Sequence, residues 1–146
     1  GIMDEFAVAK GRAHSLMALL CQPASLLSPV RLPPGLRVWG LDSHVRHAVS
    51  GSDYGAVRVG AFMGYRIIAE LAGLRCQPPA AQGGAYQVED PVWGGYLANM
   101  SPSEFEARYA HALPETITGA DFLATYGGTT DPVTTIDPQR TYAVRA

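Results

Sequence analysis

The chain has 146 residues, of which 47% are hydrophobic and 16% are charged, and its formal net charge is −2. That length fits one ordinary domain, and the apolar content is too high for a disordered chain. Eleven basic residues against thirteen acidic ones argue against a polybasic nucleic-acid binder, and the apolar runs are too short to cross a membrane. Cys21 and Cys76 are far apart and predict neither a disulfide framework nor a cysteine-type zinc site. No signal sequence opens the chain, so we expect a cytoplasmic location.

The first part of the chain has the pattern of one helix followed by short strands. Apolar residues at three- and four-residue spacing predict a helix over Met3–Lys10. The continuous apolar run Ser15–Cys21 predicts a buried strand. Ser25–Leu32 contains Pro29, which restricts it to an edge strand or a strand end, and Pro33–Gly35 predicts a turn.

Alternating residues over Leu36–Asp42 predict a further strand, and Tyr54–Ala72 predicts the longest helix. We expect the core-facing stripe of that helix to contain Val57, Ala61, Ile68 and Leu71. Gly60 and Gly64 lie four residues apart on the same helix and form a small notch where another backbone can approach closely.

The second half combines a linker-like segment with short helices. Gln77–Gln87 has the composition of a low-complexity linker. Ser101–Glu104 is a capping box that begins a helix, which we expect to end at Pro114. The cap pattern recurs at Thr118–Asp121, and Thr129–Arg140 reads as a long irregular segment.

Common nucleotide and metal motifs are absent from the sequence. There is no G-x-x-x-x-G-K-[ST] motif, and Lys10 is the only lysine. Gly51–Gly55 reads as a capped turn, with an anion site at a helix N-terminus as the alternative. His44 and His47 lie near Asp42, but in a loop, so we interpret them as polar loop residues and assign no metal ligand.

Two charged residues allow both a structural and a chemical interpretation. Asp4 is in the first helical turn, where the helix dipole lowers the pKa of a carboxyl group and where an acid also stabilises the helix. Arg46 is in a loop after a predicted strand and is free to reach a phosphate, although a surface ion pair is the simpler interpretation.

At these residues the sequence resembles a known enzyme family. Gly1-Ile2-Met3-Asp4 resembles the C-G-[IV]-M-D-Q motif of GHMP-superfamily sugar kinases, which include the galactokinases. Val45–Val49 and Ser52–Tyr54 resemble the V-R-H-S-L…S-E-Y segment of that family. Four further stretches are similar to the L-arabinokinase branch: Trp39–Ser43, Arg58–Gly64, Tyr96–Pro102 and Asp131–Thr134.

The resemblance implies an α+β fold that is part of a two-lobed GHMP kinase. Residues 1–35 would end the N-terminal lobe and carry the active-site helix, and residues 36–76 would start the C-terminal lobe. Residues 77–90 would be a linker, and residues 91–146 would be a helical segment of the C-terminal lobe. The phosphate loop of the family would precede Gly1, so we expect this chain to be an interior piece of a longer kinase.

The activity implied is transfer of the ATP γ-phosphoryl group to the anomeric hydroxyl of L-arabinose or D-galactose. By resemblance Asp4 is the catalytic carboxylate, Gly1 and Tyr54 contact the sugar, and Arg46 lies near the phosphates. ATP and Mg²⁺ would be held mainly by residues outside this chain, so the isolated piece is expected to be inactive. Glu5 stands where the family has Gln, and its charge would raise the pKa of Asp4 slightly.

Two other functions remain open at this point. A kinase-fold protein can bind sugar without catalysis and act as a sensor or regulator. The acidic helical half, Glu89–Asp121, can form a face for a protein partner, although a solvated helix surface explains the same charges.

Overall fold

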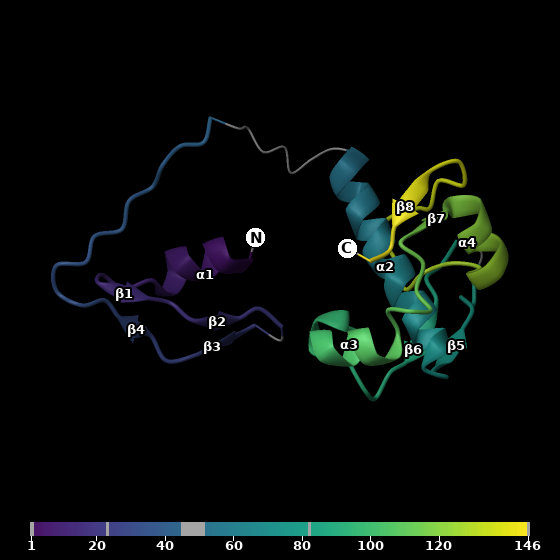
Figure 1. Cartoon of the computed structure of the whole chain (residues 1–146), viewed down its shortest axis with the longest axis horizontal. Helices are drawn as coiled ribbons and strands as arrows, with labels where there is room; N and C mark the ends of the chain where they lie inside the picture. Colours follow the sequence, from purple (N-terminus) through teal and green to yellow (C-terminus); the bar gives the residue numbers. More distant parts are fainter. Residues whose placement is uncertain (1, 23, 45–51, 82, 146) are drawn as a thin grey trace. The chain divides into compact units, whose positions relative to one another are not determined.

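A computed structural model describes residues 2–22, 24–44, 52–81 and 83–145, with the side chains of Ser52 and Asp53 excepted. The chain divides into two compact units, Gly1–Arg46 and His47–Ala146 (Figure 1). Mixed helices and two-stranded sheets confirm the α+β class. Each unit is described by itself below.

Unit 1 consists of one helix and one long, interrupted hairpin. Helix α1 spans Ile2–Lys10, as predicted. The hairpin has two paired segments, in which β1 pairs with β4 and β2 pairs with β3, all antiparallel. The bounds of these strands are β1 Ser15–Leu16, β2 Leu19–Leu20, β3 Ser25–Leu26 and β4 Val30–Arg31.

The apolar run from Ser15 to Cys21 is therefore not one continuous strand. Leu16 pairs with Val30, and the next pair along the hairpin is Leu19 with Leu26. The interval from Leu26 to Val30 is therefore one residue longer than the interval from Leu16 to Leu19 on the opposite side. Pro29 lies in this interval and has no N–H to donate to the ladder. Pro29 thus interrupts the ladder on both sides of the hairpin: it separates β3 from β4 and, opposite them, β1 from β2.

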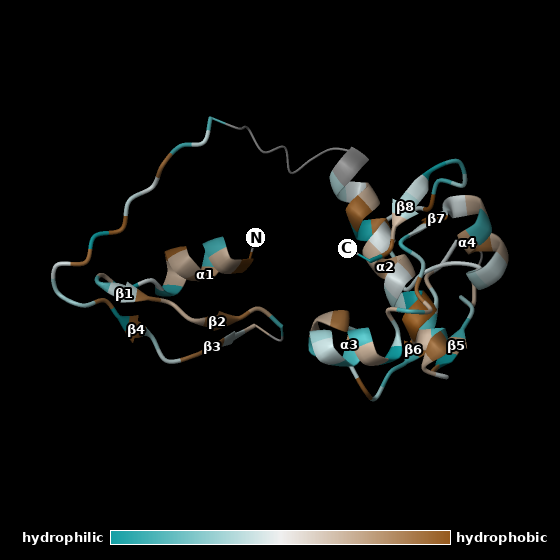
Figure 2. Cartoon of the chain, in the orientation of Figure 1, coloured by the Kyte–Doolittle hydropathy of each residue, from teal (hydrophilic) through white to brown (hydrophobic). Residues whose placement is uncertain are grey.

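Unit 1 has little buried surface among its described residues. None of residues 2–22 and 24–44 is buried, and apolar side chains of the hairpin, such as Leu16 and Val30, are about half exposed. Figure 2 shows several hydrophobic segments, in brown, along this hairpin. The strand predicted over Leu36–Asp42 is wrong, because these residues have no ladder partner among the described residues. Alternation alone does not make a strand where no second strand supplies hydrogen bonds.

Unit 2 is built around the long helix α2, Ser52–Leu71, close to the predicted bounds. Two antiparallel strand pairs, β5–β6 and β7–β8, pack with shorter helices around it (Figure 1). These elements are β5 Arg75–Gln77, β6 Gln87–Glu89, the 3₁₀ turn η1 Leu97–Asn99, α3 Pro102–Arg108, β7 Thr116–Thr118, α4 Gly119–Tyr126 and β8 Thr141–Ala143. Residues 78–86, within the segment expected to be a linker, connect the paired strands β5 and β6.

The core of unit 2 forms around α2, whose residues from Met63 to Ala69 are all buried. Val59, Met63 and Ile67 are at most 4% exposed, at successive four-residue steps. Of the four residues expected on the core stripe, Ile68 is buried at 1% exposure, whereas Val57 and Leu71 are 59% and 48% exposed and Ala61 is also exposed. The core is completed by Ile68, Trp93, Tyr109, Leu113, Phe122, Tyr142 and Val144.

Both predicted helix caps are confirmed. The Ser101 hydroxyl accepts a hydrogen bond from the Glu104 backbone N–H at 3.1 Å, and Thr118 does the same for Asp121 at 3.1 Å. Helix α3 ends at Arg108 rather than at Pro114, because the residues between them continue as a turn. Cap residues act within one turn of the chain, which is why the sequence alone located them.

Candidate functional site

Asp4 lies in the first turn of α1, where the sequence places it, and its side chain is exposed. Asp4 is therefore a solvent-accessible carboxylate, with Glu5 beside it in the same turn.

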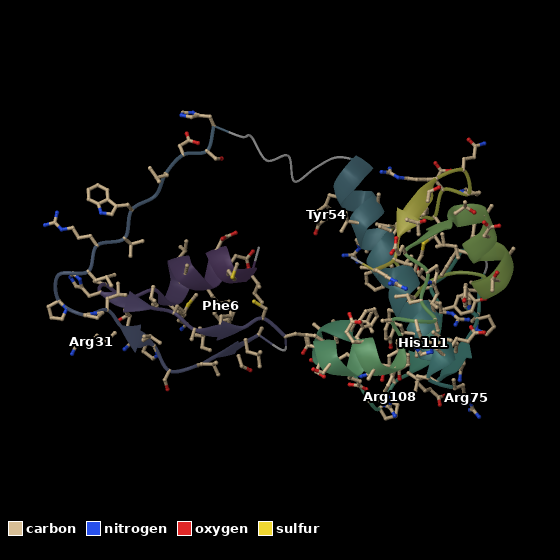
Figure 3. The ribbon with its side chains drawn as sticks, in the orientation of Figure 1. Phe6, Arg31, Tyr54, Arg75, Arg108 and His111 are labelled. Carbon is tan, nitrogen blue, oxygen red and sulfur yellow. The ribbon has the colours of Figure 1, made fainter. Side chains whose placement is uncertain are left out.

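Tyr54 lies in the first turn of α2 and is 58% exposed. Its side chain projects away from the packed body of unit 2 (Figure 3). Tyr54 is thus available to a ligand, and it belongs to unit 2 while Asp4 belongs to unit 1. Gly1 and Arg46, the other two predicted site residues, lie outside the described residues.

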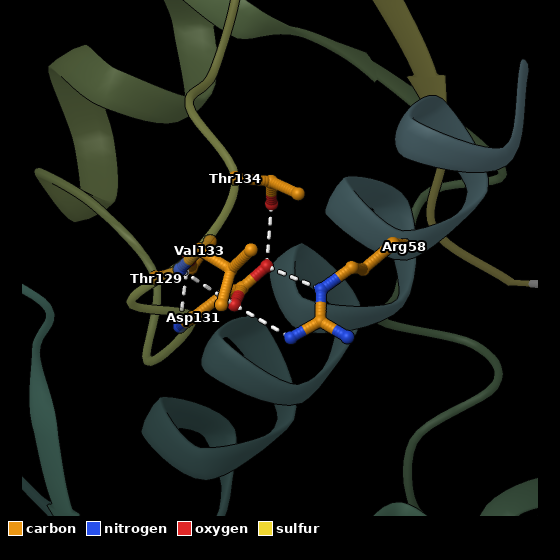
Figure 4. A network of polar contacts seen from close by, with 5 residues as sticks. All are labelled: Arg58, Thr129, Asp131, Val133 and Thr134. Atoms are coloured by element: carbon orange, nitrogen blue, oxygen red, sulfur yellow. Dashed lines mark hydrogen bonds and ion pairs between the residues drawn. The ribbon is translucent and has the colours of Figure 1, made fainter. Parts of the chain in front are cut away.

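One turn beyond Tyr54, Arg58 forms a bidentate ion pair with Asp131 (Figure 4). The Nε and Nη2 atoms of Arg58 donate to the two carboxylate oxygens of Asp131, each at 2.8 Å. The Thr134 hydroxyl and the Val133 backbone N–H also donate to this carboxylate. The Asp131 side chain is 0% exposed, so its charge is balanced entirely by these donors.

The electrostatics of this cluster follow from the pairing. The hydrogen bond from the Arg58 guanidinium, with those from Thr134 and Val133, outweighs burial and holds the pKa of the Asp131 carboxyl well below its ordinary value. The same hydrogen bond raises the pKa of Arg58. The guanidinium also lies over the ring of Phe62, with 5.1 Å between its carbon and the ring centroid. Arg58 is therefore charged and held from two sides.

The sequence did not predict this pair, because its partners are 73 positions apart. A signal was nevertheless present. Arg58 and Asp131 open two of the four stretches that resemble the L-arabinokinase branch, Arg58–Gly64 and Asp131–Thr134. In the structure the ion pair between Arg58 and Asp131 connects these two stretches.

A second carboxylate organises the loop that follows β6. Asp90 accepts hydrogen bonds from the Tyr65 hydroxyl and from the backbone N–H groups of Val92, Trp93 and Gly95, at 2.8 to 3.0 Å. Burial acts to raise the pKa of Asp90, but these hydrogen bonds together lower it. The loop is thereby fixed so that Trp93 enters the core at 3% exposure, which is a structural role.

The described residues contain no group of three or more His, Cys, Asp or Glu side chains suited to a metal ion. His44 instead interacts with Asp42, whose carboxylate accepts the His44 backbone N–H at 2.8 Å. His47 lies outside the described residues. Among the described helices, none is both long enough and apolar enough to cross a membrane.

Comparison with known proteins gives matches of two kinds. The chain is 40% identical, over its whole length, to an L-arabinokinase from Arabidopsis thaliana. Half of the chain is 37% identical to a galactokinase from Chloroflexus aggregans and 36% identical to one from Chloroflexus aurantiacus. No protein-family model and no solved structure matches the chain.

The matches cover only part of each relative. The chain aligns with 15% of the L-arabinokinase and its matching half with 18% of each galactokinase. The alignment with the L-arabinokinase runs over the whole of this chain, and all three relatives are sugar kinases by name. By sequence, this chain is homologous to a stretch of the sugar kinases of the galactokinase and L-arabinokinase branch.

Proposed function

We propose that the protein to which this chain belongs is an ATP-dependent sugar 1-kinase that phosphorylates the anomeric hydroxyl of L-arabinose. The observation that carries the proposal is the 40% identity to an L-arabinokinase across all of the described units. Galactokinases match only half of the chain, which favours arabinose over galactose. D-galactose is the second substrate we expect to be accepted, since L-arabinopyranose has the same ring configuration without the hydroxymethyl group.

Asp4 is the proposed catalytic residue. It is an exposed carboxylate in the first turn of a helix, where the dipole favours its ionised form. Its role would be to accept the proton of the attacking sugar hydroxyl or to orient that hydroxyl toward the phosphorus. General-base assistance of this kind contributes about 10²- to 10⁴-fold in rate. The rest of the acceleration in phosphoryl transfer comes from positioning and charge stabilisation.

Substrate contacts are proposed for three further residues. Tyr54 supports this assignment by its exposure at the start of α2, where its ring and hydroxyl can meet a sugar. Gly1 would contact the sugar through its backbone, and Arg46 would lie near the phosphates. ATP is the proposed phosphoryl donor. The described residues hold no carboxylate cluster for Mg²⁺, so we assign the ion to no residue of this chain.

The alternative is a kinase-fold protein that binds sugar without turning it over. Both hypotheses are separated by one assay on the full-length protein. Sugar-dependent ADP release is measured with L-arabinose, D-galactose and D-glucose, and sugar binding is measured separately by calorimetry. We expect ADP release with L-arabinose above that with D-galactose, and none with D-glucose. Binding of L-arabinose without ADP release would contradict the kinase hypothesis and support the sugar-binding alternative.

A further inference from the structure

We propose that the Arg58–Asp131 ion pair is a positioning device for Tyr54, fixing the start of α2 so that the tyrosine is held ready for the sugar. The proposal rests on the assignment of Tyr54 to the sugar site made above. It adds two residues to that site which contact no substrate themselves. Both act through the helix that carries Tyr54.

The geometry of α2 connects the two positions. Tyr54 and Arg58 are four residues apart, so their side chains lie on the same face of the helix, one turn from each other. The first turn of a helix leaves its N–H groups without helical partners and is the part most prone to fray. Full burial on α2 starts only at Val59, and Tyr54 is 58% exposed. The start of the helix therefore benefits from an anchor outside the core.

Arg58 supplies such an anchor because its partner is itself immobilised. Besides the two bonds from Arg58, the Asp131 carboxylate accepts from Thr134 and Val133, and the Asp131 backbone N–H donates to the Thr129 hydroxyl at 3.3 Å (Figure 4). A planar guanidinium that donates twice fixes orientation as well as distance. Moving the helix start would leave the buried carboxylate without its counter-charge, which is strongly unfavourable.

The chain offers a contrasting ion pair that fixes nothing of this kind. Arg75 and Glu89 are 3.8 Å apart with side chains 73% and 60% exposed, and they lie on the paired strands β5 and β6. An exposed pair at that distance contributes little. Glu89→Gln therefore removes one charge of an ion pair in the same unit without touching α2, and it is the matched control.

The test uses the full-length protein with Arg58→Lys, Asp131→Asn and Glu89→Gln. Lysine keeps the charge of Arg58 but loses the bidentate geometry, and asparagine keeps the shape of Asp131, so at least one variant should remain folded. For both pair variants we expect the KM for the sugar to rise about five- to tenfold, with the KM for ATP and kcat changed less than about twofold. Glu89→Gln should match the wild type.

Amide hydrogen exchange supplies a readout that does not depend on kinase activity. Exchange of residues 55–58 should become faster in Arg58→Lys and Asp131→Asn, while exchange at Ile67 and Ile68 stays slow. Combining the two substitutions should add little to the faster exchange, because either one alone already removes the bidentate geometry on which the anchor depends. Unchanged exchange at residues 55–58 in the two pair variants would overturn the proposal. An equal rise in the KM for sugar and the KM for ATP would overturn it as well. A wild-type protein without sugar-kinase activity but with the predicted exchange pattern would refute the proposed function and leave the anchor in place.

Discussion

A Cβ atom placed on Gly60 would lie 2.1 Å from the carbonyl oxygen of Ala143, so α2 and β8 meet there backbone against backbone. One turn later, a Cβ on Gly64 would lie 2.5 Å from the carbonyl oxygen of Val144. Each glycine in a helix interior costs about 1 kcal/mol of helix propensity relative to alanine. The close packing of Ala143 and Val144 against α2 offsets this cost, because only glycine leaves room for their backbone.

Gly60→Ala should therefore lower the free energy of unfolding of unit 2 by about 1–3 kcal/mol, because the methyl group forces β8 away from α2. Gly55→Ala is the matched control on the same helix, where nothing lies within 4 Å of the added Cβ. That variant should be as stable as the wild type or gain up to about 1 kcal/mol. Urea denaturation followed by tryptophan fluorescence measures both, and equal stability of the two variants would contradict the backbone contact.

The pH dependence of stability should carry a contribution from Asp131. Its pKa is depressed in the folded state, so the stabilisation is fully present above the ordinary aspartate pKa of about 3.9 and is lost as the pH falls through the folded-state value. Urea denaturation at pH 6 and pH 3 should show a loss of stability in the wild type. That loss should be smaller in Asp131→Asn. An identical loss in both proteins would show that Asp131 titrates as it does in the unfolded chain.

Ser101→Ala should destabilise the protein by about 1 kcal/mol, because the backbone N–H of Glu104 loses its acceptor. Ser103→Ala changes an exposed serine inside the same helix and removes no cap. In thermal unfolding, only Ser101→Ala should have a midpoint temperature below that of the wild type. Equal midpoints for the two would mean that the cap contributes nothing to α3.

Tyr54→Phe should raise the KM for the sugar several-fold while leaving the KM for ATP in place, because only the hydroxyl that meets the sugar is removed. Tyr96 is a suitable control, since it is 55% exposed against 58% for Tyr54 and lies in the same unit. Tyr96→Phe should behave as the wild type in steady-state kinetics of the full-length protein. A larger effect at Tyr96 than at Tyr54 would remove Tyr54 from the sugar site.

Local features of this fold could be predicted from the sequence. Helices α1 and α2 follow from apolar spacing, and the caps at Ser101 and Thr118 follow from residues three positions apart. The notch at Gly60 and Gly64 correctly predicted a close backbone approach. It could not identify β8 as the partner, because that strand comes about 80 residues later and leaves no local trace at the glycines.

The predictions that failed depended on partners distant in sequence. Alternation over Leu36–Asp42 is typical of a strand, but a strand needs a neighbour, and none of the described residues supplies one. The stripe predicted on α2 is confirmed at Ile68 but wrong at Val57, because β8, Trp93 and Phe122, all distant in sequence, decide which residues of α2 are covered. Likewise the Arg58–Asp131 pair joins positions 73 residues apart. For the site, Asp4 and Tyr54 were located correctly on helix starts, while their catalytic and binding roles remain predictions.

The most direct test of the central claim is sugar-dependent ADP release by the full-length protein carrying Asp4→Asn. The matched control is Glu5→Gln, which changes the neighbouring acid in the same helical turn in the same way. We predict that Asp4→Asn lowers kcat with L-arabinose by at least about 10²-fold while the protein stays folded, and that Glu5→Gln keeps wild-type turnover. Near-normal turnover in folded Asp4→Asn would contradict the assignment of Asp4 as the catalytic carboxylate.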